Sequence, residues 1–84
     1  MWYVYVLKSK LDHGLYIGCT NDLRHRIKLH NDGKVTATKF RGPFVLTCYE
    51  AYPDRRDAFV REKWLKTGWG RNYIKKTLKY SLGT

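Results

Sequence analysis

The chain has 84 residues and a formal net charge of +10, because 17 lysines and arginines stand against 7 acidic residues. Its hydrophobic residues make up 43% of the sequence, which supports one small core and excludes both a wholly disordered chain and a multidomain architecture. No apolar run reaches the roughly 18–20 residues of a membrane-spanning helix, so we expect one domain over residues 1–84 without a membrane segment or signal peptide.

The first predicted element is a strand over residues 2–7, because its side chains alternate in character. Its two faces are Trp2, Val4 and Val6, and Tyr3, Tyr5 and Leu7. Asp12-His13-Gly14 is typical of a hairpin turn, and a second strand is expected from Leu15 to Gly18. If Leu15 and Ile17 share the valine face of the first strand, Tyr16 joins the tyrosines on the other face.

A helix is expected after this hairpin. Thr20 or Asn21 can cap its N-terminus, and Asp22 would then lie in the first turn, where the helix dipole favours a carboxylate. Gly33 can end the helix in a left-handed conformation. One helix face carries residues at i, i+4 and i+7: Leu23, Ile27 and His30.

The second half of the chain predicts one more strand and two helices. Residues 34–42 are polar and basic, typical of a loop, and a strand follows from Phe44 to Ala51. A second helix is expected from Pro53-Asp54 to about Thr67, with Gly68 as its stop, and a third from about Arg71 to Lys79. The order ββαβαα predicts an α+β domain, a three-stranded antiparallel sheet flanked by helices.

Glu62 is the most informative single residue. It shares a stripe of the second predicted helix with Ala58 and Leu65, and a carboxylate in an apolar stripe is costly unless it is paired or binds a metal. One interpretation is a ligand for Mg²⁺, which takes one or two carboxylates together with water and phosphate oxygens. The other is a structural ion pair with a nearby lysine or arginine, and the pattern alone does not separate them.

Other polar residues have two interpretations as well. Arg26 can reach a phosphate with its guanidinium, but a single helix arginine usually faces solvent. Tyr5 and Tyr16 can be ordinary strand packing, or a phenol can act as a base if nearby cations lower its pKa. His30 lies on the apolar face, where a histidine is more often a core residue than a ligand. The histidines and cysteines have no zinc spacing.

The positive charge favours a polyanionic partner, most often nucleic acid. Two basic clusters are candidate phosphate contacts, a loop and a C-terminal segment: Lys34, Lys39 and Arg41, and Arg71, Lys75 and Lys76. Each cluster can equally be a solvated surface. The two cysteines, Cys19 and Cys48, form no paired motif. One disulfide between them is conceivable, but the pattern favours two buried or free thiols in a reducing cytoplasm.

These residues in this order resemble the GIY-YIG nuclease family. Tyr3-Val4-Tyr5 stands for the first motif and Tyr16-Ile17-Gly18 for the second, with Arg26 and Glu62 at the positions of the helix arginine and the metal-binding glutamate. The resemblance is greatest to small, stand-alone, mostly bacterial members of the UPF0213-like subgroup. It is carried there by residues 2–9, 42–44 and 62–68 and covers the chain from Met1 to about Lys79.

The resemblance implies a phosphodiester-cleaving site with one divalent ion, Mg²⁺ or Mn²⁺, on Glu62. Tyr16 would help to deprotonate the attacking water, and Tyr5 would hold water or phosphate. Arg26 would stabilise charge on the scissile phosphate, and His30 stands where the family often has a phosphate-contacting Tyr or His. Two positions depart from the family pattern: Tyr3 replaces the first-motif glycine, and Cys19 replaces a lysine found in several members.

Three functional hypotheses follow. The first is a metal-dependent DNA endonuclease, selective for branched, flapped or single-stranded structures, in repair or recombination. The second is a nucleic-acid-binding module that kept the nuclease fold without efficient catalysis. The third is a small protein that docks on a larger complex. For the first, we expect a cytoplasmic monomer with DNA as its partner, without a membrane association.

Overall fold

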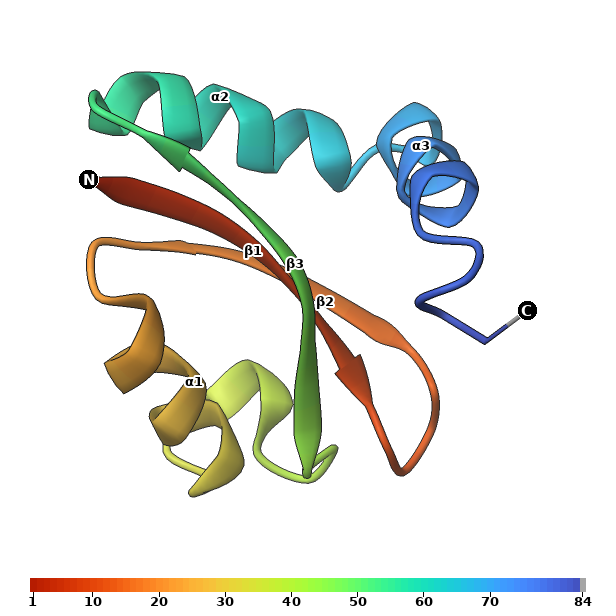
Figure 1. Ribbon diagram of the computed structural model, residues 1–84. Coiled ribbons are helices and arrows are strands. Elements are labelled where there is room, and N and C mark those ends of the chain that lie inside the picture. The colour runs from red at the N-terminus through yellow and green to blue at the C-terminus, as the bar shows by residue number, and fades with distance from the viewer. Residues whose placement is uncertain (84) are drawn as a thin grey trace.

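The computed structural model describes residues 1–83 and shows a three-stranded antiparallel sheet between two layers of helices (Figure 1). The strands are β1 (Trp2–Ser9), β2 (Leu15–Thr20) and β3 (Phe44–Tyr52), in the order β2-β1-β3. The helices are α1 (Leu23–Asn31), the short 3₁₀ helix η1 (Thr36–Thr38), α2 (Arg55–Leu65) and α3 (Gly68–Thr77). The predicted α+β class and element order are confirmed, with η1 as an addition in the segment expected to be a loop.

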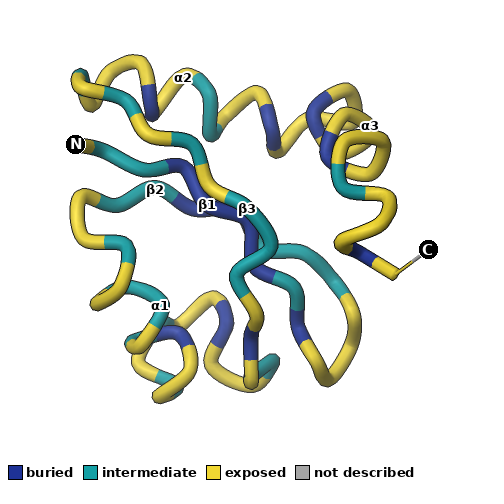
Figure 2. Tube along the Cα trace, viewed as in Figure 1, coloured by how far each residue is buried: buried dark blue, intermediate teal, exposed yellow. Residues whose placement is uncertain are grey.

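The central strand β1 carries the core on both of its faces (Figure 2). Val4 and Val6 pack with Ile17 against α2 and α3, through Ala58, Leu65 and Ile74. On the opposite face, towards α1, Tyr5 and Leu7 pack with Phe44 and with the partly buried Tyr16. The predicted separation of the valine face from the tyrosine face is therefore confirmed.

Gly18 lies opposite Tyr5 in the register between β1 and β2. The phenol ring of Tyr5 lies directly over the Gly18 backbone, so that a Cβ at this position would overlap its hydroxyl oxygen and Cζ. Only glycine, which has no Cβ, leaves enough space for the Tyr5 ring. The glycine of the second motif thus has a local reason, which is to let a buried tyrosine lie flat across the neighbouring strand.

Several element ends differ from the prediction because side-chain caps decide them. Asp22, not Thr20 or Asn21, is the N-cap of α1, and its carboxylate accepts a hydrogen bond from the His25 amide at 3.1 Å. β2 accordingly continues to Thr20. Gly68 was predicted to stop the second helix near Thr67, but α2 already ends at Leu65 and α3 begins at Gly68. The Thr67 side chain caps α3 by accepting from the Gly70 amide at 3.2 Å.

Two further expectations concern the thiols and the helices. Cys19 and Cys48 are both free and partly buried. Over residues 1–83, no helix has the length and apolar character needed to cross a membrane.

Candidate active site

A buried hydrogen-bonded chain joins β1, α1 and η1 on the tyrosine face of the sheet. The Tyr5 hydroxyl lies 2.8 Å from His30 Nε2, and His30 Nδ1 lies 2.7 Å from the Thr38 hydroxyl. All three residues are almost completely buried. The imidazole is therefore held at both nitrogens, and its orientation is determined by groups from two other elements.

The Thr38 hydroxyl orients this chain. Its hydrogen can point to the carbonyl oxygen of Val35, a long contact of 3.5 Å, and the hydroxyl can then accept from His30 Nδ1–H. The Tyr5 hydroxyl already accepts from Arg26, so its own proton is available to Nε2. We therefore assign the proton of the neutral imidazole to Nδ1. Nε2 is then the acceptor, and the Tyr5 hydroxyl donates to it.

His30 is uncharged at neutral pH. Burial, and secondarily the positive charge of Arg26, lower the pKa of the imidazole to about 4. The prediction that His30 lies on the buried face is correct, and its two hydrogen bonds explain how a polar ring is accommodated there.

The lowered pKa predicts a pH dependence of stability. The folded imidazole takes up its proton only near pH 4, whereas the unfolded one does so near 6.5, so between these values the unfolded state binds more protons. The contribution of neutral His30 is complete above about pH 6.5 and is lost as the pH falls towards 4, by at most about 1.4 kcal/mol per pH unit. Urea unfolding of wild type and His30→Gln at several pH values measures this difference, and parallel curves for the two proteins would contradict it.

Tyr5 remains a phenol at neutral pH. Burial raises the pKa of its hydroxyl to about 12, although a hydrogen bond from Arg26 acts in the opposite direction. The suggestion that nearby cations make this tyrosine a base is therefore wrong for Tyr5, because desolvation outweighs the cation. Its hydroxyl is instead a fixed hydrogen-bonding group between His30 and Arg26.

Arg26 carries an unsatisfied donor into this cluster. Its side chain is half-buried, and among residues 1–83 its buried Nε finds no hydrogen-bond partner. A buried N–H group without an acceptor costs about 1–3 kcal/mol, so this donor calls for an acceptor from outside the chain, such as an ordered water, an ion or a ligand. The donor of a guanidinium is suited to a phosphate oxygen.

Tyr16 completes the cluster from β2. Its ring centroid lies 4.9 Å from that of His30 and 6.4 Å from that of Tyr5. The side chain is half-buried and thus open to solvent on one side. The structure therefore brings the four predicted residues Tyr5, Tyr16, Arg26 and His30 together, although their chemical roles stay predictions.

Glu62 approaches from the helix layer on the other face of the sheet. Its side chain is only 12% exposed and forms an ion pair with Lys66 at 3.0 Å. Its negative charge contributes to the raised pKa values of both Tyr5 and Cys19, which places it electrostatically beside the hairpin. The stripe with Ala58 and Leu65 is as predicted, since both of these residues are buried.

The donor set at Glu62 suits one kind of metal ion. Within residues 1–83, no group of three or more His, Cys, Asp or Glu side chains is arranged to hold a metal. A single, nearly buried carboxylate fits Mg²⁺ or Mn²⁺, whose remaining ligands are water and phosphate oxygens. Lys66 is half-exposed and can turn into solvent when a cation replaces it.

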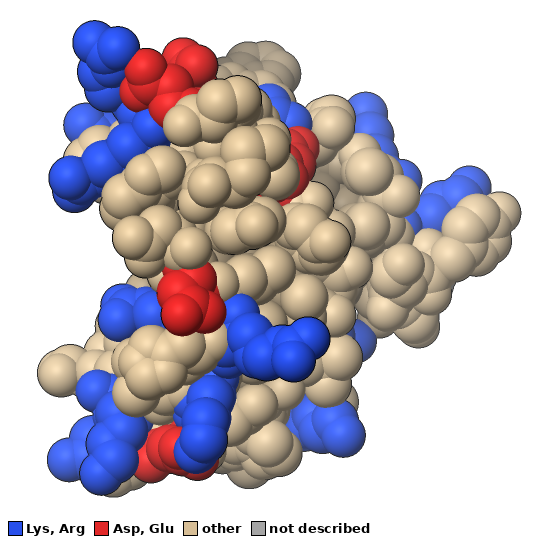
Figure 3. Space-filling model, turned by 60° about the vertical axis from the view of Figure 1, so that its left-hand side comes forward, with Lys and Arg blue, Asp and Glu red and all other residues tan. Residues whose placement is uncertain are grey.

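The predicted phosphate-contacting residues fall into three groups. Lys34 and Lys39 are exposed after α1, and Lys39 lines the same surface depression as His30. Arg41 is already engaged, since its Nε lies 2.8 Å from the Asp12 carboxylate. A third group lies on α3, across the sheet from α1, and is not brought to the cluster: Arg71, Lys75 and Lys76. Figure 3 shows two groups of basic side chains, one in the lower part of the view, at the α1 layer, and one at the top, beside α2. A largely uncharged band lies between them.

Sequence reasoning missed Thr38. Its segment was expected to be a loop, and nothing in the local sequence distinguishes this threonine from Thr36. Only the fold places Thr38 beside a histidine eight residues earlier.

Thr38→Val is expected to slow any cleavage about tenfold, because the His30 tautomer is no longer held. The substitution also leaves the buried His30 Nδ1–H without an acceptor, which lowers the free energy of unfolding by about 1–3 kcal/mol. Nitrogen NMR of the His30 ring separates positioning from simple destabilisation, since the Nδ1–H form should lose its dominance. Thr36→Val, at an exposed position, is the control. Unchanged ring resonances in Thr38→Val would refute the positioning role.

Comparison with known proteins identifies the architecture. Residues 1–78 match the model of the GIY-YIG catalytic domain. The chain belongs to the GIY-YIG family. Its resemblance to this family, first drawn from the two tyrosine motifs, Arg26 and Glu62, is confirmed.

The relatives of this GIY-YIG domain are UPF0213 proteins. It is 46% identical to one from Clostridium perfringens over 67 residues, which cover 79% of this chain and 71% of the relative. It is 43% identical to YazA of Bacillus subtilis over 65 residues, 76% of this chain and 65% of the relative. The solution NMR structure of a UPF0213 protein from Bacillus halodurans superposes with a TM-score of 0.58 at 36% identity, covering 100% of this chain and 95% of that one.

Proposed function

We propose that this GIY-YIG domain is a metal-dependent endonuclease that hydrolyses phosphodiester bonds in DNA. The observation that carries the proposal is the convergence of Tyr5, Tyr16, His30 and Arg26, with a buried Arg26 donor that lacks an acceptor. A phosphate oxygen supplies that acceptor, and the net charge of +10 attracts the polyanion that carries it.

In this proposal each residue has a separate task. Arg26 donates to the scissile phosphate and balances the charge that develops on it. The water oxygen forms a new bond to phosphorus as the P–O bond to the leaving strand end breaks. The Tyr16 hydroxyl takes up the proton of this water while it releases its own proton through solvent to the departing oxygen, so that the products are a phosphate monoester and a free hydroxyl end. Tyr5, whose proton is donated to His30, holds the water by accepting a hydrogen bond from it; holding a phosphate oxygen instead would require this proton to turn away from His30.

Glu62 would hold the divalent ion, Mg²⁺ or Mn²⁺. When bound, such an ion polarises the phosphate and lowers the pKa of coordinated water. The chain contributes a nearly buried carboxylate for this, whose lysine partner is exposed enough to leave. Lys34 and Lys39 would contact neighbouring phosphates, and Arg41 would do so only by giving up Asp12.

The proposed substrate is branched, flapped or single-stranded DNA of repair or recombination, cut by a monomer in the cytoplasm. Discrimination by DNA structure, in place of discrimination by sequence, is part of this proposal. The free thiols of Cys19 and Cys48 agree with a reducing compartment.

The ion pair between Glu62 and Lys66 supports a second candidate, a nucleic-acid-binding module without efficient catalysis. In that case the lysine permanently occupies the place of the metal. Both candidates bind DNA, and only the first cuts it.

The deciding experiment is cleavage of labelled single-stranded, duplex, flap and four-way-junction DNA with Mg²⁺, with Mn²⁺ and with EDTA. Cutting with either metal, absent in EDTA, supports the endonuclease and names its substrate class. Binding of the same DNA at low salt without cutting by either metal supports the binding module. Absence of both rejects the two candidates and favours a protein that docks on a larger complex.

A further inference from the structure

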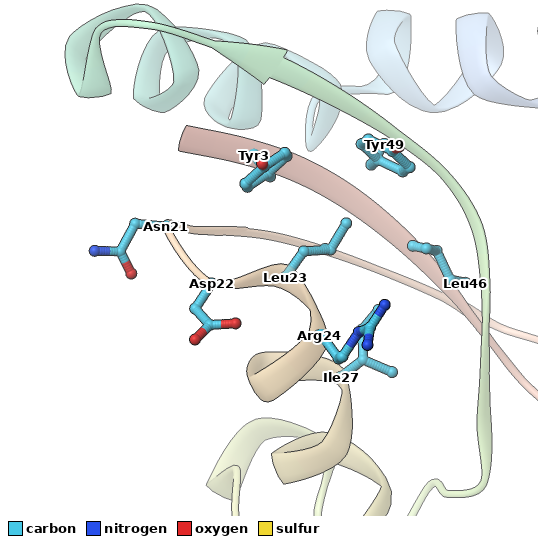
Figure 4. A pocket seen from close by; sticks show the side chains of 8 residues that line it. All are labelled: Tyr3, Asn21, Asp22, Leu23, Arg24, Ile27, Leu46 and Tyr49. Atoms are coloured by element: carbon cyan, nitrogen blue, oxygen red, sulfur yellow. The ribbon is translucent and has the colours of Figure 1, made fainter. Parts of the chain in front are cut away.

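A second concavity lies on the tyrosine face of the sheet, on the flank of α1 directed towards β3. It has a volume of about 480 Å³ and lies between the start of α1 and strands β1 and β3 (Figure 4). Tyr3 and Tyr49 form its aromatic wall, and Leu46 and Ile27 add aliphatic surface. None of the residues assigned to cleavage lines it, so it requires a separate explanation.

The wall of this pocket is an exposed aromatic pair. The rings of Tyr3 and Tyr49 meet edge to face, with centroids 5.9 Å apart, and Tyr49 is 55% exposed. Two tyrosines on a sheet surface, open to solvent on one side, offer a flat surface on which another ring can stack. Stacking on such side chains is a common way of binding unpaired bases, since every base has a π-face.

The rim of the pocket is polar and matches a nucleotide. Asn21 offers both donors and an acceptor, and Asp22 uses one carboxylate oxygen as the helix cap. The Arg24 side chain also lines the pocket, and over residues 1–83 its guanidinium has no ion-pair partner. An amide and a carboxylate can read a base edge, whereas the guanidinium can take the attached phosphate.

The pocket and the catalytic cluster are neighbours along strand β1. Tyr3 and Tyr5 share a face of β1, so about 7 Å of strand separates them, roughly the length of two stacked nucleotides. α1 joins the two sites, since Arg24 lies on one of its flanks and Arg26 on the other. A strand with its scissile phosphate at Arg26 can therefore reach the aromatic pair with a neighbouring base.

We infer that the Tyr3–Tyr49 pocket binds one unpaired nucleobase of the substrate strand beside the scissile phosphate. This inference rests on the proposed endonuclease and specifies its substrate class: DNA with at least one unpaired nucleotide next to the cut. A paired base cannot enter, because its faces are covered by the stacked neighbours and its Watson–Crick edge by the partner base.

The test is DNA binding in EDTA, which needs no cleavage. Fluorescence anisotropy at low salt compares a labelled single strand of twelve thymidines with a labelled duplex of the same length. Tyr49→Ala is expected to weaken binding of the single strand about tenfold and of the duplex less than twofold. Tyr49→Phe keeps the ring and should bind like wild type, and Tyr80→Ala, at a tyrosine 87% exposed beyond α3, is the surface control.

A single strand of abasic residues is the matched ligand control. Wild type and Tyr49→Ala should bind it equally, because there is no base to stack. The inference is overturned if Tyr49→Ala binds the thymidine strand normally, if it loses duplex binding equally, or if wild type binds no single strand at all. If Tyr49→Ala binds the thymidine strand as wild type does, the aromatic pair would instead be a docking surface for a different class of molecule.

The inference and the endonuclease proposal fail in different ways. Tyr49-dependent binding without metal-dependent cutting would support the base pocket and reject catalysis. If Tyr49→Ala cuts DNA like wild type and binds the single strand with equal affinity, the endonuclease is supported and the base pocket is rejected. Thermal melting of each variant verifies that it folds, which is expected because Tyr49 is more than half exposed.

Discussion

Glu62→Gln is expected to reduce metal-dependent cleavage about a thousandfold while DNA affinity in EDTA stays within twofold. The substitution keeps the shape of the side chain and removes the one negative charge that acts on both Tyr5 and Cys19. Loss of one preorganised electrostatic group commonly costs about 10²–10³ in rate, and loss of the metal adds to this. Phosphate contacts dominate affinity, so binding survives.

Glu50→Gln is the matched control for this variant. Glu50 is also a partly buried carboxylate in an ion pair, with Arg61 at 2.9 Å, but it lies on β3 and accepts from Tyr52. Its substitution should lower stability and leave cleavage intact. Titration calorimetry with Mn²⁺ supplies a second measurement, because Glu62→Gln should lose the heat of binding that wild type and Glu50→Gln show. Wild-type cleavage by Glu62→Gln would mean that Glu62 is only the structural partner of Lys66.

Gly18→Ala is expected to lower the free energy of unfolding by about 2–3 kcal/mol and to slow cleavage at least tenfold. The added methyl group would overlap the Tyr5 phenol, which is fully buried and hydrogen-bonded to His30 and so has no free space to move into. Overpacking of a buried site typically costs about 1–3 kcal/mol. Displacement of Tyr5 also breaks the hydrogen-bonded chain through His30 to Thr38.

Urea unfolding of two further variants tests this explanation. Gly68→Ala should be tolerated, because among residues 1–83 no atom beyond its chain neighbours and the backbone of its own helix lies within 4 Å of the new Cβ. In a Tyr5→Ala background, the cost of Gly18→Ala should largely disappear, since the two substitutions share one contact. Additive costs in the double variant would show that Tyr5 is not the group that excludes a side chain at residue 18.

Much of the fold was predictable from local patterns. Alternation in β1 separates Val4 and Val6 from Tyr5, and the hairpin then places Tyr16 on the tyrosine face. Element ends were less predictable, because caps compete over short distances. Asp22 prevailed over its neighbours as the cap of α1, and the Thr67 cap started α3 directly after α2.

The candidate site was likewise predictable in part: the sequence selected its residues but did not predict their environment. The spacing of motifs was sufficient to select Tyr5, Tyr16, Arg26, His30 and Glu62. It did not reveal that Tyr5 is a buried phenol with a raised pKa, because desolvation depends on what packs around the ring. Nor did it separate Arg41, which is paired with Asp12, from lysines that are free to meet a phosphate.

The sequence by itself determined the class of fold and the family, because periodicity and motif order are local properties of the chain, and its net charge favours a polyanionic partner. Only the tertiary structure decided which groups meet. Thr38 reaches His30 from another element, Gly18 makes room for Tyr5 across a strand, and Tyr49 joins Tyr3 beside α1. These contacts depend on register and packing between distant segments, where burial changes the pKa, the hydrogen bonds and the accessibility of each side chain.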